Sequence, residues 1–207
     1  MVQIISDVAS DPLENLRILD LGCLEGLFAI ELAQQGSKVV GIEGREANIE
    51  KARFAKDVLG LNNLELILDD VRNLSKEKYG RFDVVLCLGL LYHLGVPDVF
   101  AFAKRMGDVC ERFAIIDTHV SLVPEESHVY DGRTYWGCTF QEHSSDSTSV
   151  ERARALWSSL DNVASFWFTR ASLFNLLSYA GFTSVYECPA PPALKQPYDR
   201  ITVLAIK

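Results

Sequence analysis

The chain has 207 residues, and its 28 aspartates and glutamates outnumber its 20 lysines and arginines, giving a formal net charge of −8. Its 48% hydrophobic and 23% charged residues are typical of a globular protein and exclude a disordered chain. The length fits one domain, or one domain with a large insertion. An acidic chain also lacks the broad basic surface of proteins that wrap nucleic acid.

No apolar run approaches the roughly 20 residues of a membrane span. The first residues have neither the basic nor the apolar region of a signal peptide. We therefore expect a cytoplasmic protein that does not associate with membranes. The five cysteines are scattered without a C-x-x-C pair, so we expect reduced core thiols rather than disulfides or a zinc site.

Residues 17–118 alternate short apolar runs with helical patterns. The runs predict strands at residues 17–21, 38–43, 64–68, 82–87 and 112–116. The intervening patterns predict a helix carrying Leu24, Leu27, Phe28 and Leu32, a helix over residues 46–59, and a helix beginning near Pro97. Strands without a polar face indicate a parallel sheet covered on both sides, a doubly wound α/β fold. Ligands of such sheets bind beyond the carboxyl ends of the strands.

The alternation stops after Asp117. Residues 119–168, which we call the insertion, are rich in serine, threonine and aromatic residues and contain every tryptophan. Within the insertion, residues 148–151 form a capping-box pattern. It predicts a helix bearing Val150, Ala153, Trp157 and Leu160.

The sheet pattern resumes with a helix from about Arg170, a strand near residues 183–187 and a last strand at residues 201–206. The Pro-rich linker 188–192 leaves no room for a crossover helix. The last strand should therefore run antiparallel, inserted between neighbours. We expect residues 1–207 to form a single domain with a seven-stranded, mostly parallel sheet and the insertion as a substrate cap.

Three strand ends in succession carry groups suited to a nucleoside. The turn at residues 20–26 places Gly22 where the backbone can approach a ligand and Gly26 where a helix can pack closely on the sheet. Glu43, about 20 residues further on, can accept hydrogen bonds from a ribose diol. After the third strand, Asp70 can accept a hydrogen bond from an adenine amino group while Val71 covers the ring. Together they indicate an adenosine ligand.

These residues resemble the class I S-adenosylmethionine-dependent methyltransferases. Residues 20–26 are similar to the glycine-rich first motif of that superfamily, Glu43 to its ribose-binding acid, Asp70 and Val71 to its adenine-binding pair, and residues 82–87 to its fourth-strand motif. The resemblance covers residues 15–118 and 169–207 and implies a Rossmann-like fold with S-adenosylmethionine as cofactor. It implies the cofactor-binding set Asp20, Gly22, Cys23, Gly26, Glu43, Gly44, Asp70, Val71, Cys87, Leu88 and Gly89. Leu24 is a departure, because many members have a middle glycine there.

NAD is the competing nucleotide. Its G-x-G-x-x-G fingerprint is absent, because Leu24 occupies the place of the second glycine. Asp20 also places a carboxylate before the turn, which suits a cationic amino-acid group better than a pyrophosphate.

Candidate catalytic groups follow the fourth strand. Tyr92 and His93 lie there, and a base is needed if the acceptor holds a proton. A loop-packing role for His93 is the alternative. Residues 89–94 also resemble the Leu-Tyr-His-Leu signature of the bacterial enzyme that carboxymethylates wobble uridine in tRNA and of its small relatives.

The remaining histidines lie in or at the start of the insertion. His119 and His143 are candidates for acid/base or substrate-bonding roles alongside His93. The spacings of His119, His128, Cys138 and His143 match no compact zinc pattern, so we expect no metal site. The aromatic residues of the insertion suit a pocket wall or a subsidiary core. As substrate-binding candidates we take Tyr92, Tyr135, Trp136 and Trp167.

The sequence therefore predicts a methyltransferase acting on oxygen or nitrogen of a small-molecule or saccharide-like acceptor. One alternative is an RNA- or tRNA-modifying methyltransferase, and another is a non-catalytic S-adenosylmethionine-binding or scaffold protein. The insertion holds seven acids and three bases, half of the net charge. It should repel a phosphate backbone, so we expect a neutral or cationic acceptor rather than nucleic acid.

Overall fold

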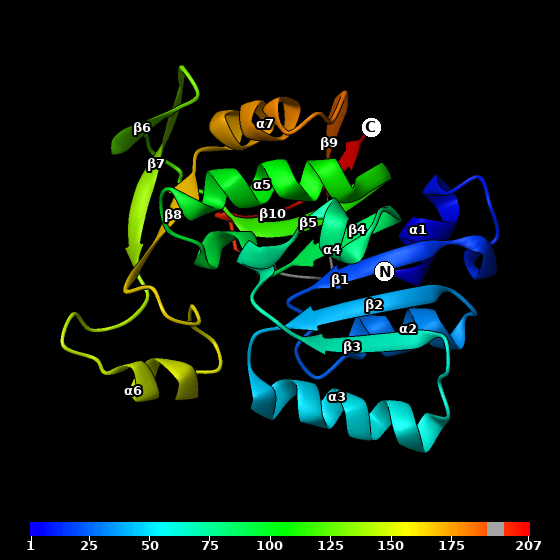
Figure 1. Cartoon of the computed structure of the whole chain (residues 1–207). Coiled ribbons are helices and arrows are strands. Elements are labelled where there is room, and N and C mark those ends of the chain that lie inside the picture. Colours follow the sequence, from blue (N-terminus) through cyan, green and yellow to red (C-terminus); the bar gives the residue numbers. More distant parts are fainter. Residues whose placement is uncertain (190–196) are drawn as a thin grey trace.

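The structure, a computed structural model, describes residues 1–189 and 197–207. Seven strands form one sheet in the order β3-β2-β1-β4-β5-β10-β9 (Figure 1). β1 to β5 pair in parallel, and β10 runs antiparallel to both β5 and β9, as predicted. The Pro-rich linker of the prediction lies mostly outside the described residues. The strands are β1 (Arg17–Leu21), β2 (Lys38–Glu43), β3 (Leu64–Leu68), β4 (Phe82–Leu88), β5 (Cys110–His119), β9 (Ser184–Cys188) and β10 (Arg200–Ile206).

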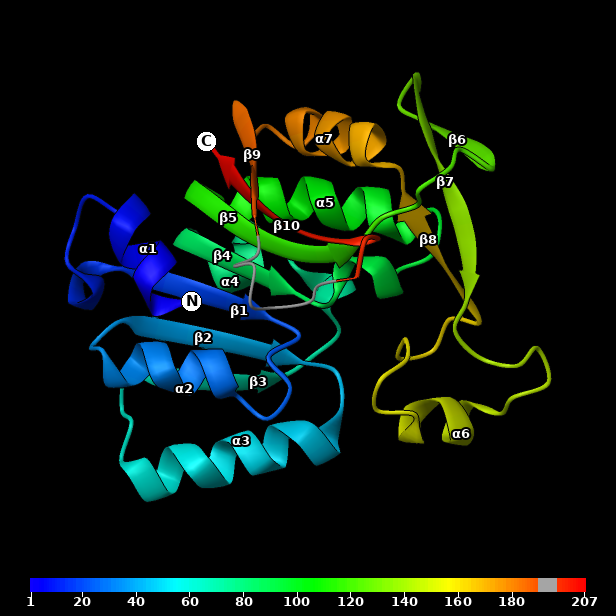
Figure 2. The same ribbon diagram turned by 180° about the vertical axis from the view of Figure 1, so that it is seen from behind.

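Helices cover both faces of this sheet, which explains why its strands are apolar on both sides. One hydrophobic cluster joins the sheet to three of these helices, and another joins it to three others. Figure 2 shows the helices of both groups beside the sheet. The first group is α1 (Val2–Val8), α2 (Leu27–Gln34) and α3 (Glu46–Leu59); the second is α4 (Lys76–Tyr79), α5 (Asp98–Val109) and α7 (Arg170–Tyr179). The fold is the predicted Rossmann-like arrangement.

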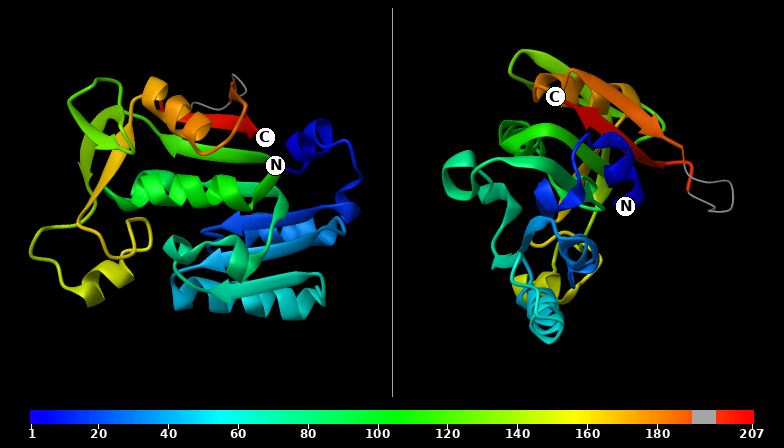
Figure 3. Two further views of the ribbon diagram at one scale, coloured as in Figure 1. Left: turned by 45° about the horizontal axis from the view of Figure 1, so that its top comes forward. Right: turned by 90° about the vertical axis from the view of Figure 1, so that its right-hand side faces the viewer.

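The insertion forms a second sheet at one end of the first, with both chain ends lying toward the other end (Figure 3). Its three antiparallel strands run in the order β6-β7-β8, with α6 in the connection between the last two. β8 is joined to the main body by a hydrogen bond from the Phe166 N–H to the Leu94 carbonyl. These elements are β6 (Glu126–Tyr130), β7 (Arg133–Gln141), α6 (Ser149–Arg154) and β8 (Ala164–Phe168).

Two helix predictions need correction. Leu24 lies in the turn before α2, with a left-handed φ of 50°, and Leu27 is exposed rather than packed on the sheet. The capping box at Thr148 and Glu151 forms as predicted. However, α6 ends at Arg154, so Trp157 and Leu160 lie outside it. The Arg45 side chain binds the carbonyl oxygens of Ala153 and Ala155, which in a longer helix would accept backbone hydrogen bonds.

None of the helices within residues 1–189 and 197–207 combines the length and the apolar character needed to cross a membrane.

The close packing of α5 on α7 depends on Gly107. A Cβ atom there would overlap the carbonyl oxygen of Ala180, just after α7. We expect Gly107→Ala to lower the free energy of unfolding by about 1–3 kcal/mol, because overpacking forces the backbone apart. Urea denaturation measures this change. Lys104→Ala, an exposed position on the same helix, is the control and should change stability by less than about 0.5 kcal/mol; equal effects would contradict the packing explanation.

Candidate functional site

A cavity of about 260 Å³ lies at the carboxyl ends of the central parallel strands. The loops after β1, β2, β3 and β4 form one side of it, and residues 156–162 of the insertion form the other. Nine predicted site residues line it: Gly22, Glu43, Gly44, Asp70, Val71, Leu88, Gly89, Tyr92 and His93. Residues 156–162 belong to the segment predicted as a substrate cap, although the sequence singled out none of them as site residues. It did not point to Arg45, Arg72, Leu90, Leu94 or Arg200, which also line the cavity.

Glu43 holds two of these loops together. It ends β2 and is only 3% exposed. Its carboxylate accepts hydrogen bonds from the backbone N–H of Leu24 at 3.0 Å and of Arg45 at 2.8 Å. A carboxylate has about four acceptor positions. Asn48 also donates to it through Nδ2 at 3.4 Å, so Glu43 keeps the capacity to accept a further hydrogen bond from a ligand hydroxyl in the cavity.

Asp20 lies buried behind the glycine turn. Its Oδ2 has no hydrogen-bond partner within the described residues, and burial raises the pKa of this carboxyl to about 7. Gly22, two residues on, has a left-handed φ of 68° and contributes to the cavity wall. Asp20 itself does not line the cavity. A buried carboxyl with one oxygen left without a partner in the described part of the chain, two residues before Gly22, favours a ligand that carries a positive charge.

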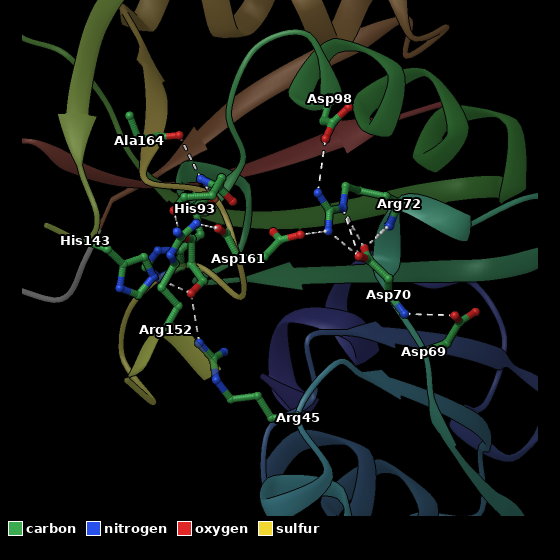
Figure 4. A network of polar contacts seen from close by, with 12 residues as sticks. Arg45, Asp69, Asp70, Arg72, His93, Asp98, His143, Arg152, Asp161 and Ala164 are labelled. Carbon is green, nitrogen blue, oxygen red and sulfur yellow. Dashed lines mark hydrogen bonds and ion pairs between the residues drawn. The ribbon is translucent and has the colours of Figure 1, made fainter. Parts of the chain in front are cut away.

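Asp70 belongs to an ion-pair network that reaches the insertion (Figure 4). Arg72 contacts the Asp70 carboxylate through Nε at 2.9 Å and Nη2 at 2.5 Å. The same guanidinium pairs with Asp161 of the insertion at 2.6 Å and with Asp98 at 3.3 Å. An adenine amino group at this carboxylate would therefore share it with Arg72.

Arg45 fastens the insertion over the cavity. Its Nη2 donates to the carbonyl oxygens of Ala155, Ser158 and Ser159 at 2.9–3.0 Å. Its Nε donates to the carbonyl of Ala153 at 3.3 Å. These contacts bend residues 153–159 around the guanidinium and explain why α6 stops at Arg154.

His93 sits at the side of the cavity where β4 ends. Its Nδ1 lies 2.9 Å from a carboxylate oxygen of Glu142, which comes from the insertion just after β7. Burial raises the pKa of Glu142, but hydrogen bonds from His93, Ser165 and the Ser159 backbone bring it below its ordinary value. Glu142 is therefore ionised at neutral pH, and Nδ1 of His93 must be the donor.

Arg200 enters the same cavity from the start of β10. Its Nε and Nη2 contact Asp117 at 2.7 and 2.6 Å, and Asp117 also accepts a hydrogen bond from Thr202. The positive charge of Arg200 is thus compensated, while its other N–H groups remain as donors. A Cβ atom built at Gly89 would lie 3.7 Å from both the guanidinium and the Tyr92 hydroxyl. Gly89 thus leaves space between these two polar groups.

His119 and Trp167 lie on the other side of Tyr92. Their rings stack with centroids 4.7 Å apart, and His119 packs edge-on against Tyr92. Nδ1 of His119 lies 3.3 Å from the carboxylate of Asp199. The indole N–H of Trp167 donates to the Tyr92 carbonyl at 3.1 Å. Neither ring lines the cavity, so both support Tyr92 from behind.

Several predicted residues are placed elsewhere. Cys23 and Cys87 are buried, and burial raises the pKa of both thiols, that of Cys87 to about 12. Gly26 is the N-cap of α2. His143 does not line the cavity, and its Nε2 lies 2.8 Å from the carbonyl oxygen of Ser159.

The two neighbouring aromatic residues of β7 point in opposite directions. Tyr135 is fully buried against Phe100 and Phe168, whereas Trp136 is 46% exposed. Neither is brought to the cavity. Across the described parts of the chain, no three histidine, cysteine or acidic side chains gather in a way that could hold a metal ion.

The buried Asp20 makes the stability of the protein depend on pH. Its pKa is about 7 when folded and near its ordinary 3.8 when unfolded, so the folded state binds the proton more tightly. Stability is therefore lost as pH rises between these values. Between pH 5.5 and 7 we expect wild type to lose about 2 kcal/mol that Asp20→Asn does not lose. Urea denaturation at both pH values, without ligand, measures this; parallel pH profiles would contradict it.

Comparison with known proteins agrees with this geometry. Residues 12–160 match the family model described as a methyltransferase domain. A ubiquinone biosynthesis O-methyltransferase from Methylocella silvestris is 40% identical over 99 residues, 48% of this chain and 37% of that protein. One from Acinetobacter baumannii is 32% identical over 98 residues, 47% of this chain and 40% of that protein. The matched stretch thus spans only 37–40% of these relatives.

Solved structures match nearly the whole chain. The N-terminal domain of EvdMO1 with SAH (S-adenosylhomocysteine) bound has a TM-score of 0.76 and 30% identity, covering 97% of this chain and 83% of that one. The magnesium protoporphyrin IX methyltransferase from Synechocystis with bound SAM is 18% identical, with a TM-score of 0.62 over 100% of this chain and 77% of that one, and shows the shared fold. The chain therefore belongs to the methyltransferase domain family and is a class I S-adenosylmethionine-dependent methyltransferase domain.

Proposed function

We propose that this chain transfers a methyl group from S-adenosylmethionine to a hydroxyl oxygen of a small, polyhydroxylated acceptor of the saccharide type. The observation that carries the proposal is the position of His93, which lines the same cavity as Gly22, Glu43 and Asp70. A potential base is thus open to the space where a cofactor and an acceptor would meet.

The residues of the cavity fit the cofactor. Glu43 would hold the ribose hydroxyls, Val71 would cover the adenine, and the loop at Gly22 would receive the methionine part. The Asp20 carboxyl precedes this loop and has one oxygen without a partner in residues 1–189 and 197–207, which suits the amino group of the methionine part. Bound S-adenosylmethionine supplies an electrophilic methyl group, whose carbon–sulfur bond breaks as the oxygen–carbon bond forms.

The acceptor end of the cavity combines His93, Tyr92 and Arg200. A neighbouring pair of hydroxyls matches these groups, because one can donate to Nε2 of His93 while another accepts from the guanidinium. Asp117 already balances the charge of Arg200, so a carboxylate on the acceptor is not required. The acidic insertion gives no support to a nucleic-acid acceptor.

Related proteins support oxygen as the methylated atom and a sugar as the acceptor. The curated relatives are named as O-methyltransferases. The EvdMO1 domain was also crystallised in the presence of SAH and D-fucose, and this chain is 31% identical to it over 96% of its own length. The insertion, with residues 156–162 along the cavity, would then act as the substrate cap.

Glu43→Gln tests the cofactor assignment. The amide keeps the shape of the side chain but loses the charge that would accept the ribose hydroxyls. We expect SAH affinity, measured by calorimetry, to fall about 10- to 100-fold, the value of one hydrogen bond to a charged group. Glu46→Ala, exposed in the first turn of α3, is the control and should bind SAH like wild type. Unchanged affinity in Glu43→Gln would contradict the assignment.

His93→Gln tests the base. Purified protein would be incubated with S-adenosylmethionine and D-fucose, other hexoses, catechol or tRNA, with SAH release and the methylated product detected by mass spectrometry. We expect a methylated sugar, and a loss of turnover of about 10²- to 10⁴-fold in His93→Gln. His128→Gln, outside the cavity, is the control. Release of SAH only with catechol or tRNA, or with none of the acceptors, would count against the saccharide class.

A further inference from the structure

Glu142 is a charged residue of the insertion whose side chain is buried beside His93. Its side chain is 1% exposed, and it follows β7 in the insertion, 49 residues from His93 in the sequence. Burying a carboxylate is costly unless hydrogen bonds compensate it, and an apolar residue of similar size would serve packing equally well or better. A buried carboxylate in contact with a candidate base therefore points to a role at the site.

Three donors satisfy this carboxylate. One oxygen accepts from the Ser165 hydroxyl of β8 at 2.8 Å, and the other from the Ser159 N–H at 2.9 Å. Both oxygens also lie 2.9–3.0 Å from Nδ1 of His93. The serine donors fix the carboxylate in one orientation, so the direction of its bond to His93 is fixed as well.

We propose that Glu142 is a positioning residue, which holds His93 in the tautomer with the proton on Nδ1 and a bare Nε2 toward the cavity. An ionised carboxylate can only accept hydrogen bonds, so it selects the Nδ1–H form. A bare Nε2 is what a base needs in order to take the proton from an acceptor hydroxyl. The proposal rests on the proposed function of His93 and extends it to a residue of the insertion.

The insertion thereby contributes to the chemistry as well as to the cavity wall. Ser159, which orients Glu142 through its N–H, is also held by Arg45 through its carbonyl oxygen. Arg45 in turn donates its backbone N–H to Glu43. A continuous series of hydrogen bonds thus joins the ribose-binding side of the cavity to the base, and Glu142 is its last member before His93.

Glu142→Gln is the informative variant, because it keeps the volume but replaces one acceptor oxygen by an N–H donor. The new amide can donate to Nδ1 and favour the opposite tautomer, with the proton on Nε2. The ring nitrogens of His93 would be observed by nitrogen-15 NMR in protein saturated with SAH. We expect the chemical shifts of Nδ1 and Nε2 to exchange places relative to wild type, and Glu142→Asp to restore part of the wild-type signal.

Turnover gives the second measurement, with the hexoses of the acceptor screen. We expect kcat to fall about 10²-fold in Glu142→Gln, within the range for general base catalysis, with KM changing much less. Glu125→Gln, exposed in the same insertion, is the matched control and should leave the His93 signals unchanged. Calorimetry with SAH confirms that each variant is folded.

The outcomes separate the two proposals. If the His93 signals in Glu142→Gln equal those of wild type, the positioning role is wrong, whatever His93 does. If the signals exchange but His93→Gln keeps full turnover, Glu142 controls the tautomer and His93 is not the base. Loss of turnover in His93→Gln with unchanged signals in Glu142→Gln overturns only the role of Glu142.

Discussion

The architecture of the site depends on the buried carboxylate of Glu43. Backbone N–H groups from the turn after β1 and from the start of α3 both donate to it, and the N–H groups of Gly22 and Cys23 donate to the Ile42 carbonyl, so the two loops form one surface. The backbone of Arg45 is held by Glu43, and its guanidinium binds carbonyl oxygens of the insertion. Because a buried charge must be satisfied, these contacts are coupled: displacing the insertion, the glycine turn or α3 would leave polar groups unpaired.

The acidic character of the insertion takes a different meaning in three dimensions. Asp161 pairs with Arg72, Glu142 accepts from His93, and Glu151 closes the capping box of α6. These three of the seven acidic side chains of the insertion therefore also have structural contacts, although only the Glu142 side chain among them is buried. A net charge summed over a segment describes long-range attraction, whereas here three carboxylates hold the segment to itself and to the main body.

The parts of the structure that could be predicted are those encoded by near neighbours in the sequence. β1, β2 and β3 have the predicted bounds, because a short apolar run followed by glycine or acid is a local signal. Glu43 was found through its spacing from the glycine turn. Glu142 and Arg200 were not, because their roles arise from contacts across 49 and 83 residues that leave no periodic pattern. The early end of α6 was missed for the same reason, because Arg45 is more than 100 residues away from the carbonyl groups that it binds. In β7, successive side chains point to opposite faces, so Tyr135 is buried while Trp136 is exposed.

β10 lies between β5 and β9 in the sheet, and this position affects the order in which the parts of the site can form. The cofactor side is built from residues 20–73, whose contacts are short in sequence, so its loops can close early in folding. The acceptor side needs Asp117 to contact Arg200, 83 residues away, and β10 to pair with β5 and β9 on its two sides. A chain folded only through β4 would therefore have a nucleoside-binding half without the means to select an acceptor. The contacts of the proposed donor side are thus local in sequence, whereas those of the proposed acceptor side join distant parts of the chain.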